Sequence, residues 1–114
     1  MHKIYGLLGF AQKAGKISAG TSAAKASLTR RKAHLLLLSN DIAKDTKEGL
    51  VGISQKLNIP WVELGNKYDL GKSVGKAYRV AITINDEKFA QAVLDTLYGM
   101  REIRETMGVA EWPE

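Results

Sequence analysis

The stretch AHLLLLSND, residues 33–41, decides the fold of this chain. Its four consecutive leucines show neither the alternation of a half-buried strand nor the 3.6-residue spacing of an amphipathic helix. A short apolar run bounded by polar residues is typical of a strand buried on both faces. We therefore expect Leu35–Leu38 to lie at the centre of a sheet that helices cover on both sides.

Helical and extended patterns alternate on either side of this strand. Apolar residues at helical spacing predict helices at about residues 2–14, 23–32, 45–57, 66–74 and 87–97, and short strands are expected at 16–19, 61–64 and 79–84. The order αβαβαβαβα implies an α/β fold, a three-layer α/β/α sandwich around a small mixed four-stranded sheet.

Local signals also predict how the helices begin. Residues 20–22, Gly-Thr-Ser, offer capping groups for the second helix, and Asp45 with Glu48 resembles a capping box. Asn66 with Asp69 marks another helix start, and residues 85–87 begin the last helix with acids in its first turn.

Positive charge is concentrated in the first forty residues. They hold seven Lys and Arg and no acid, whereas residues 41–114 hold ten Lys and Arg and twelve Asp and Glu, so the net charge of +5 divides into +7 and −2. A localised positive field attracts polyanions, which makes nucleic acid the first partner to test. A solvated helical face that happens to be basic is the alternative interpretation.

Composition excludes several classes of protein. The 114 residues suit one compact domain, and the absence of cysteine rules out disulfides, thiolate metal sites and thiol catalysis. Leu35–Leu38 is the longest apolar run and is too short to span a bilayer, and the first residues lack the pattern of a signal peptide. We expect a cytoplasmic protein with no membrane partner.

Motifs for cofactors and catalysis are weak. Residues 65–73, GNKYDLGKS, imitate a phosphate-binding loop, but five residues separate the glycines where the motif has four. His2 and His34 have no metal-ligand partner at a suitable spacing. Asp41 and Asp45 follow a strand, where carboxylates cap helices more often than they transfer protons. The sequence predicts no enzyme, no cofactor and no metal site.

Helical spacing continues past the last predicted helix, through Met100, Ile103 and Met107. We expect residues 1–98 to form the domain and residues 99–114 a helical extension and tail. The extension either docks on a protein partner or the ribosome, or folds back on its own domain.

An ordered set of motifs carries a resemblance to a known family. The set comprises LGFAQKAGK (8–16), Gly20 at a helix start, AHLLLLSND (33–41), IPWV (59–62), LGKSVGK (70–76) and a final β-rich run. In this order, over about residues 4–97, the chain resembles the L-seven-Ae family of ribosomal and kink-turn-binding proteins. Its opening is similar to the LG-x-AQ-x-AGK of the short bacterial members of the YlxQ type.

The resemblance implies a non-catalytic, ribosomal-protein-like RNA-binding module whose partner is structured RNA of the translation machinery, either ribosomal or kink-turn-like. In the family, the helix at the position of Gly20 faces sheared G·A pairs, and the loop before the last strand packs against an extruded base. The RNA-binding residues so implied are Gly20, Thr21, Ser22, Lys76, Ala77, Tyr78 and Arg79, with backbone contacts from Lys13, Lys16, Lys25 and Arg30. Tyr78 either stacks on a base or packs beside the sheet.

The second helix departs from the family pattern. Members that read kink-turns carry G-x-N-E-x-x-K, whereas residues 20–26 are GTSAAKA. Ser22 replaces Asn, Ala23 replaces Glu, and Lys25 arrives one residue early, which turns its side chain by about 100° around the helix. The departure predicts RNA affinity with weak sequence discrimination. The alternative function is a protein-interaction module of the same fold with weak, non-specific RNA affinity.

Overall fold

A computed structural model describes residues 2–99 of the chain. Within these residues helices and strands alternate as the sequence predicts. The elements are α1 (His2–Lys13), β1 (Ile17–Ala19), α2 (Thr21–Thr29), β2 (Leu35–Leu38), α3 (Lys44–Lys56), β3 (Trp61–Glu63), α4 (Lys67–Ser73), β4 (Ala81–Ile84) and α5 (Glu87–Tyr98). The helical extension expected around Met100 to Met107 lies outside the described residues.

The four strands form one mixed sheet in the order β1-β4-β2-β3. β4 is antiparallel to both of its neighbours, so that Ile84 lies opposite Ile17 on one side and Leu35 on the other. β2 and β3 are parallel, with Leu37 opposite Val62. β2 is therefore an interior strand, as predicted, and the last strand of the chain lies between the first two.

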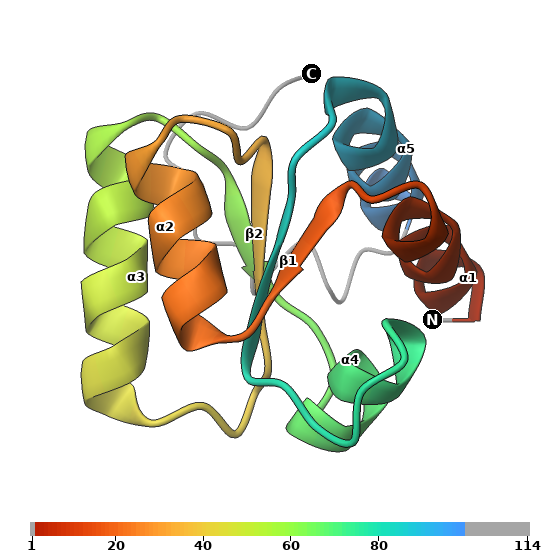
Figure 1. Ribbon diagram of the computed structural model, residues 1–114, viewed down its shortest axis with the longest axis horizontal. Helices are drawn as coiled ribbons and strands as arrows, with labels where there is room; N and C mark the ends of the chain where they lie inside the picture. The colour runs from red at the N-terminus through yellow and green to blue at the C-terminus, as the bar shows by residue number, and fades with distance from the viewer. Residues whose placement is uncertain (1, 100–114) are drawn as a thin grey trace.

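Helices cover both faces of this sheet (Figure 1). α2 and α3 lie on one face, α1 and α5 lie on the other, and α4 lies at one end of the second layer. Leu35 and Leu37 pack into the core under α1, α4 and α5, whereas Leu36 and Leu38 pack under α2 and α3. Successive side chains of a strand point to opposite faces of the sheet, and helices cover both faces. All four leucines are therefore buried. The α/β/α sandwich is confirmed.

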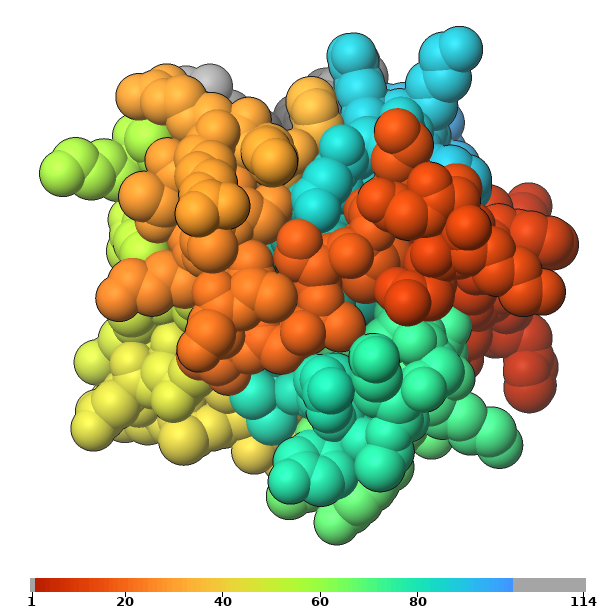
Figure 2. Space-filling model, viewed as in Figure 1, coloured from red at the N-terminus to blue at the C-terminus, as the bar shows by residue number. Residues whose placement is uncertain are grey.

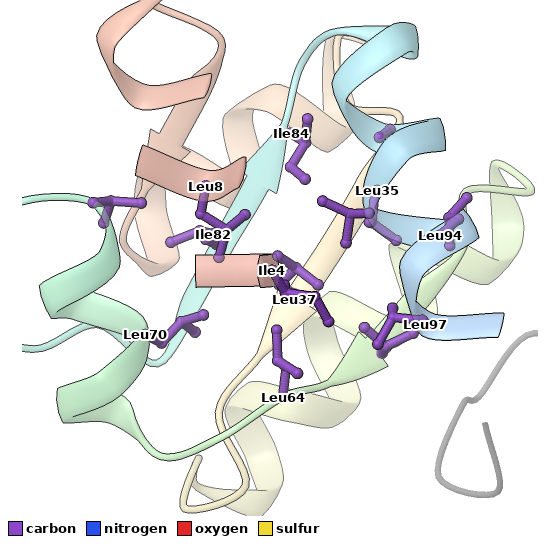
Figure 3. Packing of buried hydrophobic residues seen from close by; sticks show 14 residues of the cluster. Ile4, Leu8, Leu35, Leu37, Leu64, Leu70, Ile82, Ile84, Leu94 and Leu97 are labelled. Atoms are coloured by element: carbon purple, nitrogen blue, oxygen red, sulfur yellow. The ribbon is translucent and has the colours of Figure 1, made fainter. Parts of the chain in front are cut away.

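The larger core lies between the sheet and α1, α4 and α5. Figure 3 shows Ile4 and Leu8 of α1 pointing toward Leu37 and Ile82 of the sheet. These four side chains are fully buried. Burying a side chain of this size contributes roughly 1.5–3 kcal/mol. This packing anchors the layer to which α4 belongs.

The caps of α2 and α3 differ from the sequence prediction. Of the three residues expected to cap α2, Gly20 is the N-cap, and neither hydroxyl of Thr21 and Ser22 caps the helix. α2 follows Gly20, whose φ of 111° favours glycine, and no side chain caps that helix. Thr21 and Ser22 lie inside its first turn. α3 follows Ala43, again without a side-chain cap, so the capping box expected at Asp45 is absent. At α2 a bond from the N–H of Gly20 to the carbonyl of Ala81 holds the helix start, and the capping signal in the local sequence does not.

The other two predicted helix starts are confirmed. The Asn66 side chain accepts hydrogen bonds from the backbone N–H groups of Tyr68 and Asp69, at 3.0 and 2.9 Å. The Asp86 carboxylate accepts one from the N–H of Phe89 at 2.9 Å. Such bonds satisfy donors that have no partner within their own helix. They fix the first turns of α4 and α5.

Candidate functional site

Strand direction brings four connections to one end of the sheet. β1, β2 and β3 all run toward this end, and β4, which is antiparallel to β1 and β2, begins there. The start of α2, the start of α4 and the loop before β4 therefore gather at what we call the Gly20 end. The opposite end, where β1 begins, is called the Lys16 end.

Gly20 joins the two segments that the resemblance assigns to RNA binding. Its N–H donates a hydrogen bond to the carbonyl of Ala81 at 2.8 Å. A Cβ atom at Gly20 would lie 3.7 Å from Nε and 3.8 Å from Cδ of Arg79, so the Arg79 side chain lies against the start of α2. Figure 2 shows the orange start of α2 directly against the green-cyan residues of α4 and the following loop. The two segments form one surface.

The first turn of α2 offers hydrogen-bond donors to an anion. Thr21, Ser22 and Ala23 are exposed, no acid lies in this turn, and no side chain caps it. The first N–H groups of a helix have no acceptor within the helix, and they carry the positive end of its dipole. Phosphate oxygens and base acceptors both suit such a site. Lys25 adds charge on the same face because it lies four residues after Thr21.

The loop at residues 76–79 is held against α4. A Cβ atom at Gly71 would come within 2.5 Å of Cα of Tyr78 and 2.8 Å of N of Arg79, so only glycine permits this approach. The N–H of Arg79 donates to the carbonyl of Lys67 at 2.9 Å. Lys76, Ala77 and Tyr78 are exposed. Tyr78 is 55% exposed, so its ring projects from the loop into solvent and does not pack beside the sheet.

Two residues that the sequence analysis missed lie beside Tyr78. Tyr68, in the first turn of α4, is 59% exposed, and its ring centroid lies 6.4 Å from that of Tyr78 at an interplanar angle of 68°. Nζ of Lys67 lies 5.3 Å from the Tyr68 centroid and 5.7 Å from the Tyr78 centroid. The sequence carried a signal for Tyr68. Leu70 in α4 and Val74 just after it mark the buried side of this segment, and position 68 lies off that side, which indicates an exposed ring.

Asp41 ties the end of β2 to the start of α4. Its Oδ1 accepts a hydrogen bond from the N–H of Lys67 at 3.0 Å. The Ser39 hydroxyl is the main cause that lowers the pKa of the Asp41 carboxyl, and the Lys67 backbone and charge lower it further. Asp41 therefore acts on a helix start, as the sequence analysis favoured over proton transfer.

Three of the implied residues lie away from this surface. Lys13 is the last residue of α1, and Arg30 is the C-cap of α2. The carbonyl of Lys16 accepts a hydrogen bond from the N–H of Asn85, just past the end of β4, at 2.7 Å. All three lie at the Lys16 end. α2 spans nine residues, about 14 Å, which separates Arg30 from the Gly20 end.

A polar network missed by the sequence analysis orients α2. Oδ1 of Asn85 accepts hydrogen bonds from the hydroxyls of Ser27 at 2.6 Å and Thr83 at 2.9 Å. Nδ2 of Asn85 donates to the Ser18 hydroxyl at 2.8 Å. One amide thus links β1, α2 and β4. A satisfied network of this kind specifies one arrangement of its elements.

Residues 2–99 contain no helix that is long and apolar enough to cross a membrane. In the same part of the chain, no group of three or more His, Cys, Asp or Glu side chains is placed to hold a metal ion.

Comparison with protein families identifies the fold family. The model of the ribosomal protein L7Ae/L30e/S12e/Gadd45 family matches residues 2–94. This chain belongs to that family. Two relatives of this L7Ae-family chain are the RNA-binding proteins YlxQ of Bacillus subtilis and Enterococcus faecium, each 28% identical to it. The matches cover 80% of the chain and 91% of the first relative, and 85% of the chain and 93% of the second.

Solved structures share the fold of this L7Ae-family chain. A Bacillus halodurans protein with unknown function superposes with a TM-score of 0.82 at 28% identity, covering 86% of this chain and 99% of that one. The 15.5 kD RNA-binding protein of Giardia lamblia superposes with a TM-score of 0.70 at 19% identity, covering 90% and 85%. The second likeness shows the fold alone. The resemblance stated from the motifs is confirmed at the level of family and fold.

Proposed function

We propose that this protein is a non-catalytic RNA-binding protein that contacts structured RNA with the surface at the Gly20 end. The observation that supports this most is the contact between Gly20 and Arg79, which makes the open first turn of α2 and the loop at residues 76–79 one exposed surface. Membership of the L7Ae family supports the same function, and the relatives in Bacillus subtilis and Enterococcus faecium are named RNA-binding proteins.

The chemistry of this surface suits RNA that is not a regular duplex. The major groove of A-form RNA is too narrow for side chains, whereas a kink or bulge opens it and exposes unstacked bases. The amides of the first turn of α2 meet phosphate or base acceptors there, and Lys25 and Arg79 neutralise phosphates. Tyr78 offers a flat ring to an extruded base. A kinked element of ribosomal RNA or another RNA of the translation machinery is the proposed ligand.

Base discrimination is weak in this proposal. Ser22 and Ala23 occupy the exposed first turn of α2, where family members that read kink-turns place Asn and Glu. A hydroxyl and a methyl group cannot match the paired donors and acceptors of a base edge as an amide or carboxylate does. Contacts to the backbone therefore supply most of the affinity, and the shape of the RNA supplies the selectivity.

Two double variants with equal loss of charge test which end of the domain binds. Lys25→Ala with Arg79→Ala acts at the Gly20 end, and Lys16→Ala with Arg30→Ala acts at the Lys16 end. Both are titrated, beside the parent protein, with a kink-turn RNA and with a plain duplex of equal length, over a series of salt concentrations. We expect only the first pair to reduce the preference for the kink-turn, and we expect it to flatten the salt dependence by about one slope unit per lost phosphate contact.

Two results contradict the proposal. Equal losses from the two double variants would show that the Gly20 end is not the preferred RNA-binding surface. If the parent protein binds neither RNA at any salt concentration, the protein-interaction alternative replaces RNA binding.

A further inference from the structure

We propose that Lys67, Tyr68 and Tyr78 form a subsite for two consecutive unpaired nucleotides of an RNA, with one base on each tyrosine ring and the connecting phosphate on Lys67. The inference rests on the proposed RNA-binding function and narrows its ligand. The preferred RNA then carries at least two adjacent unpaired nucleotides beside its duplex or kinked part.

The arrangement of the rings indicates two bases and not one. Phe10, Tyr68 and Tyr78 are the large hydrophobic side chains that are well exposed within residues 2–99, and two of them are neighbours. Sandwiching one base requires two nearly parallel rings, and the 68° angle between Tyr68 and Tyr78 does not allow that. Each ring instead offers its own face. Stacking on an aromatic ring accepts any base because every base has a π-face.

Lys67 lies where a linking phosphate is needed. Its Nζ is within about 6 Å of both ring centroids, which is the range of a cation–π contact. The two rings therefore hold the ammonium between them. Lysine binds phosphate as a compact point charge, so one ammonium between two stacking faces suits the phosphate that joins two nucleotides.

The backbone that carries these side chains is fixed before any ligand arrives. The N–H of Tyr68 donates to Asn66, and the N–H of Lys67 donates to Asp41. Tyr78 is held by the close approach of its backbone to Gly71. These bonds occupy the first amides of α4, so the subsite consists of side chains. A preorganised site loses less entropy when it binds.

Charge favours RNA over a peptide at this place. A proline-rich peptide also docks on exposed tyrosines, but it gains nothing from neighbouring cations. Lys67 lies near both rings, and Lys76 and Arg79 are close to Tyr78 in the chain. Two acids are nearby. The Asp41 carboxylate is hydrogen-bonded to the backbone N–H of Lys67, and Asp69 lies against Gly65, where an added Cβ atom would be 3.7 Å from the Cβ of Asp69.

The subsite is continuous with the surface at the Gly20 end. Arg79 lies against Gly20 and follows Tyr78 in the chain, and Tyr78 lies against Tyr68. An RNA strand that leaves the start of α2 therefore reaches Tyr78 first and Tyr68 second. Tyr78 alone suffices for one extruded base, and Tyr68 matters only when a second unpaired base follows.

The test uses the full chain and three RNAs that share one kinked duplex and carry no, one or two unpaired uridines beside the kink. Binding is titrated at one fixed salt concentration for the parent protein, Tyr68→Ala, Tyr68→Phe and Tyr78→Ala. Phe10→Ala serves as the matched control because it removes an exposed ring of α1. Circular dichroism shows whether each variant keeps the fold.

We expect Tyr68→Ala to weaken binding of the two-uridine RNA by roughly tenfold, the scale of one lost base–aromatic stack, and to leave the one-uridine RNA unchanged. Tyr68→Phe should bind like the parent protein because stacking needs the ring and not the hydroxyl. Tyr78→Ala should weaken both RNAs, and Phe10→Ala neither. Lys67→Ala should lower the salt slope for the two-uridine RNA by about one.

Each contrary result has a separate meaning. If Tyr68→Ala binds the two-uridine RNA like the parent protein while Tyr78→Ala is impaired, the subsite is wrong and the proposed function stands. If the parent protein binds none of the three RNAs, the proposed function fails and the subsite fails with it. A third result is that a proline-rich peptide binds through Tyr68 while RNA binding does not depend on the uridines. That result would make a peptide, and not RNA, the occupant of the subsite.

Discussion

The backbone of Tyr78 lies so close to Gly71 that a Cβ atom on Gly71 would come within 2.5 Å of the Tyr78 Cα. No side chain fits into that space, so glycine is required here for close approach and not for an unusual backbone angle. The loop that carries Tyr78 and Arg79 is packed on α4 through this contact. Its position at the Gly20 end therefore depends on the absence of one methyl group.

Gly71→Ala should lower the free energy of unfolding by about 1–3 kcal/mol, because the added methyl group forces the backbone of the loop away from α4. RNA binding that depends on Tyr78 should weaken with it. Urea denaturation and RNA titration measure the two effects. Gly52→Ala is the matched control. It lies in α3 with nothing within 4 Å of its added Cβ, and it should raise stability by roughly 0.5–1 kcal/mol. Equal effects of the two substitutions would contradict the steric argument.

Asn85→Ala should lower the free energy of unfolding by about 1–3 kcal/mol, because it leaves the buried hydroxyls of Ser27 and Thr83 without their acceptor. Denaturant unfolding measures the loss. Gln91→Ala removes only an exposed hydrogen bond to Asp95 and should stay within about 0.5 kcal/mol of the parent protein. A loss from Asn85→Ala as small as that of the control would show that the network does not stabilise the fold.

Asp41 gives the protein a pH dependence of known sign. Its pKa is lowered in the folded chain, chiefly by the Ser39 hydroxyl, so its carboxylate stabilises the fold above the ordinary value of 3.8. That contribution is lost as the pH falls from this value through the lowered folded pKa. The stability advantage of the parent protein over Asp41→Asn should therefore be full near neutrality and shrink in acid. Urea midpoints of both proteins across this range measure the difference, and a constant difference would contradict the assignment.

Restoring the family pattern at α2 should increase selectivity. Ser22→Asn with Ala23→Glu is expected to favour a kink-turn over a plain duplex of equal length, because new base-edge hydrogen bonds contribute about 1–3 kcal/mol for a good bidentate pair. Both positions are exposed, so the fold tolerates the change. Adding Ala26→Lys restores the third family residue. Titration of both RNAs at one salt concentration measures the ratio, and an unchanged ratio in every variant would show that α2 does not read the RNA.

The local sequence was enough to predict the three layers of the fold. The run Leu35–Leu38 needs apolar partners on both faces, and only a sheet between two helical layers supplies them. The place of β4 between β1 and β2 was not predictable in the same way, because pairing between residues far apart in the chain leaves no periodic signal.

The candidate site was predictable in its parts and not in its assembly. Gly20 opens α2 as expected, but the hydroxyls of Thr21 and Ser22 do not cap the helix, because the bond from Gly20 to Ala81 fixes its start from another strand. Lys16 and Arg30 belong to the same basic stretch of sequence as Lys25, yet strand and helix directions carry them to the opposite end. A basic stretch of sequence therefore does not show which of its side chains share one surface of the folded protein.

The position of β4 also sets when the surface at the Gly20 end forms during synthesis. Within the described sheet, β1 pairs only with β4, and the amide of Gly20 bonds to Ala81, the first residue of that strand. A nascent chain that has emerged only as far as α4 therefore holds the start of α2 without the strand that fixes it. The surface at the Gly20 end is therefore completed only after β4 has been synthesised, and the proposed RNA contacts cannot assemble before that point.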